Sequence, residues 1–94
     1  MLYVVCTNIV EKEKVDAFTK AAKAHASKSL MVDKGCIFFD ISKYNEEAKE
    51  VIFVEKWESK ELLDVHAQRC KQEPIIKEMA LNRVSVSLKV VEID

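Results

Sequence analysis

The sequence is first informative through what it lacks. It contains one glycine and one proline in 94 residues. With a single glycine it has neither a G-x-G-x-x-G motif nor a P-loop, the glycine-rich turns that hold dinucleotide and ATP phosphates. It also has no G-x-S-x-G motif and no convincing cysteine–histidine pair for nucleophilic catalysis. If the chain is an enzyme, its substrate must therefore supply most of the reactivity.

Long apolar runs and paired cysteines are missing as well. The longest apolar runs, residues 2–6 and 51–54, are far shorter than the ~20 residues needed to span a bilayer. No signal-peptide pattern opens the sequence. Cys6, Cys36 and Cys70 are odd in number, have no C-x-x-C spacing and fit reduced thiols. We therefore expect a cytoplasmic protein that does not interact with membranes.

Charge of one sign is not in excess either. Fifteen basic residues stand against 16 acidic ones, so the net charge is -1 and gives no reason to expect a nucleic-acid partner. Lysines are frequent in residues 12–34. Acidic residues interleave with them: Glu11, Glu13, Asp16 and Asp33. This mixture is typical of a solvated surface.

The apolar pattern that remains predicts strands and helices in the order β-α-β-β-α-β. The segments rich in β-branched and aromatic residues are the expected strands: 2–9, 36–43, 51–58 and 83–93. An apolar period of three to four predicts helices over residues 13–31, after Ser59 as N-cap, and over 74–81. Gly35 is the expected left-handed residue after the first helix.

This order predicts an α+β, ferredoxin-like fold in a single domain over residues 1–94, with helices on one face of a four-stranded antiparallel sheet. The first three strands, however, are apolar on both sides. Tyr3 and Val5 alternate with Leu2 and Val4, for example. Because a sheet with one wet face should alternate more strictly, the second face needs cover. The same face of another copy is the simplest cover, so we expect a homodimer.

Two motifs carry a resemblance to a known family. The first is E-x-W-E-S-x-x-x-L-x-x-H, formed by Glu55, Trp57, Glu58, Ser59, Leu63 and His66. The second is Gly35–Cys36 followed by Phe39 and Asp40. Together with the order of elements, they make residues 2–90 resemble the antibiotic biosynthesis monooxygenase family. The resemblance implies a small dimeric α/β barrel protein.

The resemblance also implies chemistry. Members of that family include cofactor-independent oxygenases of quinol-like or polyketide-like aromatics, isomerases of small carbonyl compounds and haem-degrading proteins. The haem-degrading relatives carry an iron-ligating histidine ten residues after the position of His66, where this chain has Ile76. Haem chemistry is therefore disfavoured. The chain also replaces the family's short E-P-G before the second strand with residues 32–35, V-D-K-G, which changes the rim of any pocket.

His66 is the candidate catalytic residue. It lies in the apolar stripe of Leu62, Leu63 and Cys70, so it should point at the sheet. A neutral core histidine bonded to a backbone carbonyl would explain this position. A general base would explain it equally, because an unperturbed pKa near ~6.5 suits proton transfer at neutral pH.

Five further residues are candidates for binding a substrate. Trp57 offers one indole N–H donor on a flat wall, and Phe39 offers an apolar wall. Glu55 shares the face of Trp57, where a carboxylate needs a partner. Asn8 either holds a strand end or donates to a developing oxyanion. His25 lies at the edge of its helix stripe, where we expect partial exposure.

No metal or other cofactor is expected. His66 and Cys70 are four residues apart on one helix and could form half of a metal site, but no other residues have recognisable ligand spacing. Three functions remain open: a cofactor-free quinol-type monooxygenase, an isomerase of a small hydroxycarbonyl compound, and a non-catalytic dimeric binding or stress-response module. Oxygen dependence separates the first two. The third predicts that replacing His66 changes stability alone.

Overall fold

A computed structural model describes residues 1–93 of the chain. Its elements follow in the order β1 (Leu2–Ile9), a 3-10 turn (Lys12–Lys14), α1 (Val15–Val32), β2 (Cys36–Ile41), β3 (Glu50–Trp57), α2 (Lys60–Cys70), α3 (Pro74–Leu81) and β4 (Ser85–Glu92). Across this described range, no helix combines the length and apolar character needed to cross a membrane.

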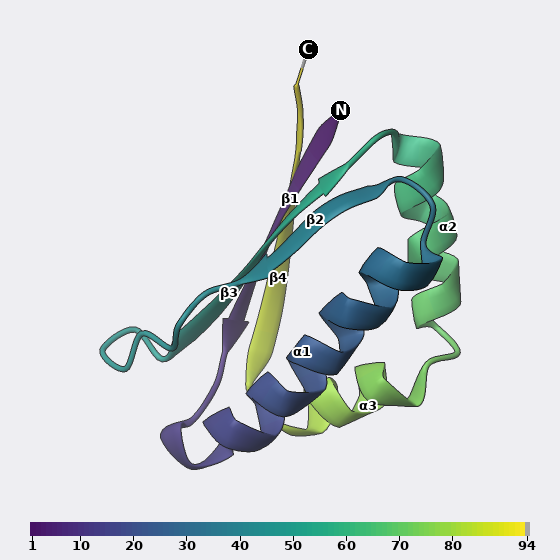
Figure 1. Ribbon diagram of the computed structural model, residues 1–94. Coiled ribbons are helices and arrows are strands. Elements are labelled where there is room, and N and C mark those ends of the chain that lie inside the picture. Colours follow the sequence, from purple (N-terminus) through teal and green to yellow (C-terminus); the bar gives the residue numbers. More distant parts are fainter. Residues whose placement is uncertain (94) are drawn as a thin grey trace.

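The four strands form one antiparallel sheet in the order β2-β3-β1-β4. The three helices lie on the same side of it, and the start of β1 and the end of β4 pair at one end of the sheet, Leu2 opposite Glu92 (Figure 1). The predicted α+β, ferredoxin-like fold and its β-α-β-β-α-β order are therefore confirmed. The hairpin predicted between the second and third strands is present, closed by the Asn45–Glu50 bridge.

Three boundaries differ from the prediction by a few residues. A 3-10 turn occupies residues 12–14, so α1 begins at Val15. β2 ends at Ile41, although Ser42 still exchanges hydrogen bonds with Ile52. β4 begins at Ser85 instead of residue 83. Arg83 lies before the strand, and its side chain donates a hydrogen bond to Asn8.

Two local predictions are confirmed at the ends of helices. Gly35 adopts a φ of 90°, the left-handed conformation expected after α1. At the start of α2, the Ser59 hydroxyl accepts a hydrogen bond from the Leu62 backbone N–H at 3.2 Å, as an N-cap should. Leu62 also packs directly against Gly35, where an added Cβ would lie 2.5 Å from Leu62 Cδ1. The turn at Gly35 and the first turn of α2 are therefore in close van der Waals contact.

The main core lies between the sheet and α1. Alternate residues of β1 and β3 are buried, and the intervening residues of the outer face are half-buried. Phe18 of α1 stacks on Phe53 of β3 with ring centroids 6.0 Å apart. Phe39 packs beside Phe53 at 5.6 Å and belongs to the same buried cluster.

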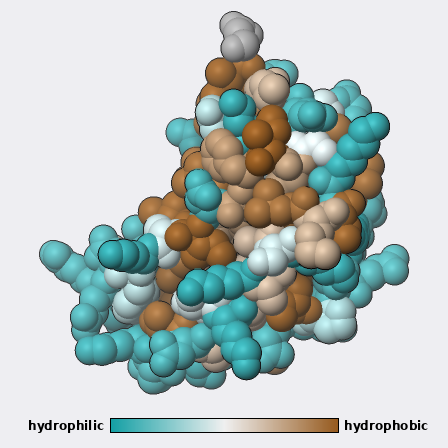
Figure 2. Space-filling model, in the orientation of Figure 1, coloured by the Kyte–Doolittle hydropathy of each residue, from teal (hydrophilic) through white to brown (hydrophobic). Residues whose placement is uncertain are grey.

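β4 is not covered by the helices. All eight of its residues are exposed, including Val86, Leu88 and Val90, which lie on the helix side of the sheet opposite buried residues of β1. Leu88 is 67% exposed although its partner Cys6 is buried. Figure 2 shows hydrophobic side chains on this face of the molecule with hydrophilic ones around them. The fold therefore leaves apolar surface open along one edge.

We predict that Gly35→Ala destabilises the protein by about 2–4 kcal/mol, since a side chain at positive φ is strained and the new Cβ meets Leu62. Chemical denaturation followed by circular dichroism measures this change. Lys34→Ala, at the exposed neighbouring position, should stay within about 0.5 kcal/mol of wild type. Equal midpoints for the two variants would contradict the prediction.

Candidate functional site

Strand alternation places Glu55 and Trp57 side by side on the helix-facing side of β3. Trp57 is fully buried, and its Nε1 donates a hydrogen bond to Glu55 Oε1 at 2.9 Å. Glu55, 5% exposed, therefore has a partner within its own strand. The indole N–H that the sequence offered to a substrate is already donated to this carboxyl group.

His66 covers Trp57 from α2. Its ring lies 4.5 Å from the Trp57 ring, centroid to centroid, and the residue is 7% exposed. The Ser59 cap sets the start of α2, and His66, the seventh residue of the helix, is buried on the side that faces the sheet. The orientation predicted for His66 is thus the one observed.

Asp33 forms a hydrogen bond with the His66 ring. Its Oδ2 lies 2.6 Å from His66 Nδ1, and both side chains are nearly buried. Because a carboxylate can only accept, Nδ1 carries the proton and donates it to Asp33. Nε2 is then the nitrogen that carries the lone pair, and Cys70 Sγ lies 3.4 Å from it. The sequence predicted Asp33 on a solvated surface; that prediction is wrong, since its side chain is only 5% exposed.

Arg69 completes the surroundings of Asp33. Its Nε donates to Asp33 Oδ1 and its Nη2 to Asp33 Oδ2, both at 2.7 Å. Nη1 donates to Glu73 at 2.9 Å, and Glu73 also pairs with Lys28 of α1. These bonds fasten the last turn of α1 and the residue after it to the end of α2. The sequence analysis did not identify Asp33 or Arg69 as site residues. For Asp33 the available signal was the V-D-K-G stretch, which departs from the family's usual E-P-G; no comparable signal marks Arg69.

The protonation states follow from these contacts. Burial lowers the pKa of His66, and this outweighs the opposite effect of the Asp33 hydrogen bond, so the ring is neutral at pH 7. Burial alone would raise the pKa of Asp33, but the hydrogen bonds from Arg69 and His66 overcome it and hold the pKa below its usual value. The pair is therefore a carboxylate and a neutral imidazole.

His25 of α1 faces the same cluster. The expectation of partial exposure is wrong: the residue is 5% exposed, because Phe39 and His66 lie against its ring at centroid distances of 5.3 and 5.4 Å. Burial, helped by the nearby His66 and Arg69, lowers the pKa of His25 to about 4. Its Nδ1 atom is buried without a hydrogen-bond partner.

Cys70 lies one turn after His66, and its Sγ is 3.4 Å from His66 Nε2. His25, His66 and Cys70 each offer a ligand atom, and these three atoms lie within 4.8 Å of one another. Imidazole nitrogen and thiolate sulfur are the donors that zinc prefers. This cluster could hold a metal ion.

Asn8 lies elsewhere. It is buried on the same sheet face, opposite Val51, but Trp57 stands six residues further along β3, which is roughly 20 Å of strand. Its amide nitrogen donates to the Val51 carbonyl at 3.0 Å, and its oxygen accepts from Arg83 at 3.0 Å. Asn8 therefore ties β1, β3 and the segment just before β4 together.

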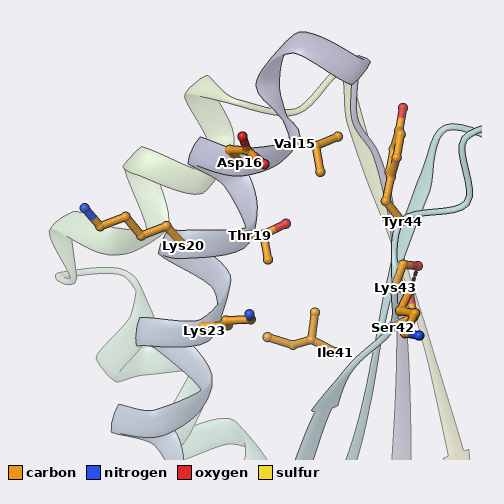
Figure 3. Close-up of a pocket in the computed structure, with 9 residues that line it drawn as sticks. All are labelled: Val15, Asp16, Thr19, Lys20, Lys23, Ile41, Ser42, Lys43 and Tyr44. Carbon is orange, nitrogen blue, oxygen red and sulfur yellow. Dashed lines mark hydrogen bonds between the residues drawn. The ribbon is translucent and has the colours of Figure 1, made fainter.

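Five of the six predicted residues thus gather in one place: His25, Phe39, Glu55, Trp57 and His66. Two surface hollows in the described part of the chain lie outside this cluster. Figure 3 shows the first, an open groove where Val15 and Thr19 of α1 face Ile41, the last residue of β2, and Tyr44 in the loop that follows. None of the six predicted residues lines either hollow.

Glu55 is the most perturbed carboxyl group of the cluster. Burial raises its pKa from 4.5 to about 7, and the Trp57 hydrogen bond only partly opposes this. A carboxyl group that is neutral below pH 7 could donate or accept a proton near the histidines. Such perturbed groups concentrate at functional sites, although buried structural pairs show them too.

We predict that Glu55→Gln stabilises the protein above pH 7 and has little effect near pH 4. The folded state holds the Glu55 proton up to about pH 7 and the unfolded state only to about 4.5, so wild-type stability falls between these values. The difference should reach roughly 3 kcal/mol. Unfolding at a series of pH values measures it.

Glu58→Gln, at an exposed position next to β3, is the matched control and should follow the wild-type pH profile. A stability gain for Glu55→Gln that is the same at pH 4 and pH 8 would contradict the assigned protonation of Glu55.

Solved structures of similar shape cover almost the whole chain. A conserved protein from Methanosarcina mazei is 22% identical and matches with a TM-score of 0.78, over 96% of this chain and 89% of its own. A Mycobacterium tuberculosis protein is 16% identical, with a TM-score of 0.75 over 97% and 92%. A structure described as an antibiotic biosynthesis monooxygenase is 14% identical, with a TM-score of 0.77 over 100% and 99%. At these identities the likeness establishes the fold.

Among curated proteins, no sequence matches this chain. The family model for antibiotic biosynthesis monooxygenases matches residues 1–74, which run from β1 to the first residue of α3 and include the whole cluster around His66. The resemblance inferred from the E-x-W-E-S-x-x-x-L-x-x-H motif is therefore confirmed. The chain belongs to the antibiotic biosynthesis monooxygenase family.

Proposed function

We propose that the protein is a cofactor-independent monooxygenase that oxidises a small quinol-like or polyketide-like aromatic with dioxygen, with His66 as the general base. The observation that carries the proposal is the 2.6 Å contact between Asp33 Oδ2 and His66 Nδ1. Family membership supports the reaction class.

The Asp33–His66 pair suits proton abstraction. With its proton fixed on Nδ1, the ring keeps its lone pair on Nε2, which faces Cys70 Sγ at 3.4 Å and would accept the proton of a substrate bound there. When Nε2 takes a proton, the imidazolium is stabilised by the carboxylate already in contact with it. Arg69 keeps that carboxylate ionised and oriented through two hydrogen bonds. Asp33 is therefore a positioning residue for the base.

The substrate itself provides the electrons. For an anthrone-like phenol, loss of a proton to His66 gives an anion that can reduce dioxygen directly. One oxygen atom then enters the ring as a carbonyl and the other leaves as water, so that CH₂ plus O₂ becomes C=O plus H₂O. The protein contributes the base and an apolar wall.

The apolar wall is formed by Trp57 and Phe39. Both are buried on the helix side of the sheet, at centroid distances of 4.5 Å from His66 and 5.3 Å from His25, respectively. Low polarity around the base strengthens the Asp33–imidazolium attraction that develops during proton transfer. Glu55 adds a carboxyl group with its pKa near neutrality, able to exchange a proton with bound oxygen species.

We predict that His66→Gln lowers catalysed oxygen uptake by about 10²–10⁴-fold, because glutamine can still contact Asp33 but cannot serve as a base. An oxygen electrode measures uptake with a panel of dihydroquinones and anthrone-like phenols, using metal-free protein. Gln68→Ala, at an exposed position on the same helix, should retain wild-type uptake.

Wild-type uptake no faster than the spontaneous rate for every substrate would contradict the oxygenase proposal. Uptake that is equal in wild type and a folded His66→Gln variant would contradict the role of His66. Conversion of a hydroxycarbonyl compound without oxygen consumption would instead support the isomerase.

We also propose that two copies associate through the outer face of the sheet. Tyr3 and Phe38 meet on this face at 5.9 Å, and Val5 and Val54 pair beside them, half-buried. Apolar side chains on the face opposite the helices are expected at an interface between copies.

We predict that the wild type sediments as a dimer and that Val54→Glu shifts it to a monomer, since a charge on the central strand of this face cannot be buried unpaired. Analytical ultracentrifugation distinguishes the two masses. Leu81→Glu, at an exposed apolar position at the end of α3, should leave the dimer intact. A monomeric wild type would contradict the proposed association.

A further inference from the structure

We propose that His25, His66 and Cys70 form a binding site for one divalent ion of the zinc type, with three protein ligands and an open fourth position. The sequence alone argued against a metal, because His66 and Cys70 had no third partner in recognisable spacing. The third partner comes from α1, across the helix interface.

The spacing of the donor atoms fits such a site. In a tetrahedral zinc site, a bound imidazole nitrogen and a bound sulfur lie about 3.6 Å apart, from Zn–N near 2.1 Å and Zn–S near 2.3 Å. His66 Nε2 and Cys70 Sγ lie 3.4 Å apart. The whole set lies within 4.8 Å, so closing it requires His25 to approach by about 1 Å.

The second observation is the unpartnered nitrogen of His25. The residue is 95% buried, and its Nδ1 has no hydrogen-bond partner. A buried polar atom without a partner destabilises the fold, so its retention in a core calls for an explanation. A metal ion bound through Nδ1 would supply the missing partner. A leucine or phenylalanine would serve equally well if the position only filled the core.

Asp33 prepares His66 for metal binding. A metal-bound histidine almost always donates its other ring N–H to a carboxylate, carbonyl or water, which fixes the tautomer and orients the ring. Asp33 accepts this bond at His66 Nδ1 and leaves Nε2 directed to Cys70. The carboxylate is itself held by Arg69, as such supporting groups usually are.

The donor set selects the class of ion. Two imidazoles and one thiolate favour zinc and similar borderline metals, whereas magnesium and calcium require oxygen ligands. The positive charge of Arg69 disfavours a cation at the cluster, but Asp33 and Glu73, which both pair with Arg69, offset that charge. Cys70 is partly exposed, so an external ligand could reach the fourth position from its side.

This site goes beyond the proposed function and has a consequence for it. A bound ion would occupy the lone pair of His66 Nε2 that the oxygenase needs as its base. The metal would therefore inhibit oxygen uptake. Binding itself does not depend on the oxygenase proposal and is measured without substrate.

The test is titration of the metal-free, reduced protein with cobalt(II), followed by optical absorption. Wild type should bind one ion per chain and develop both tetrahedral d–d bands and a thiolate-to-cobalt charge-transfer band, which zinc then displaces. Cys70→Ser should remove the charge-transfer band. Cys36→Ser, which removes another partly buried thiol outside the cluster, should retain it.

Two further variants test the remaining groups. His25→Gln should weaken cobalt binding at least tenfold, and Asp33→Asn should weaken it about 10–100-fold through the orientation of His66. Circular dichroism confirms that each variant is folded. A wild type that gives no charge-transfer band, or a band that survives Cys70→Ser and is lost in Cys36→Ser, would overturn the site.

Discussion

The architecture of the site depends on one interaction, the bidentate pairing of Asp33 with Arg69. Asp33 follows the last residue of α1, and Arg69 is in the last turn of α2. Their bond holds the two helices at a fixed separation over the sheet, and it places a carboxylate beside His66. Glu73 and Lys28 extend the same network. Losing either member of a largely buried pair leaves the other charge uncompensated. The same pair therefore both orients His66 and keeps the Asp33 carboxylate neutralised by Arg69.

The cluster beneath this network is unusually polar for the interior of so small a chain. Two histidines and a glutamate lie with Trp57 between the sheet and the helices, each more than nine-tenths buried. Both imidazoles have lowered pKa values and the carboxyl group a raised one, so burial favours the neutral form of all three. The fold therefore accommodates these polar side chains because burial favours their neutral forms. The ionised groups, Asp33 and Arg69, lie at the rim of the cluster.

Much of the fold could be predicted from the sequence, because patterns within a few residues encode it. Alternation in β1 and β3, the Ser59 cap and the left-handed Gly35 act within a few residues. The site could be predicted from the sequence only in part. His66 and Trp57 belong to one continuous motif, but His25 and Asp33 reach them from another helix and its end. Asp33 was mistaken for a surface charge because its partner Arg69 stands 36 residues away. Pairings over such separations leave no local periodicity.

The open edge of β4 has a consequence for how the protein behaves when it is crowded or newly made. Within residues 1–93, β4 pairs with β1 and leaves its other side without a neighbouring strand, while Leu88 and Val90 are exposed along it. Natural sheets usually protect such edges with charge, proline or a bulge, and here Lys89 is the main charge along the strand's middle. An uncovered strand of this kind can template pairing with any extended chain. Solubility at high concentration should therefore depend on how completely this edge is shielded, independently of the chemistry at His66.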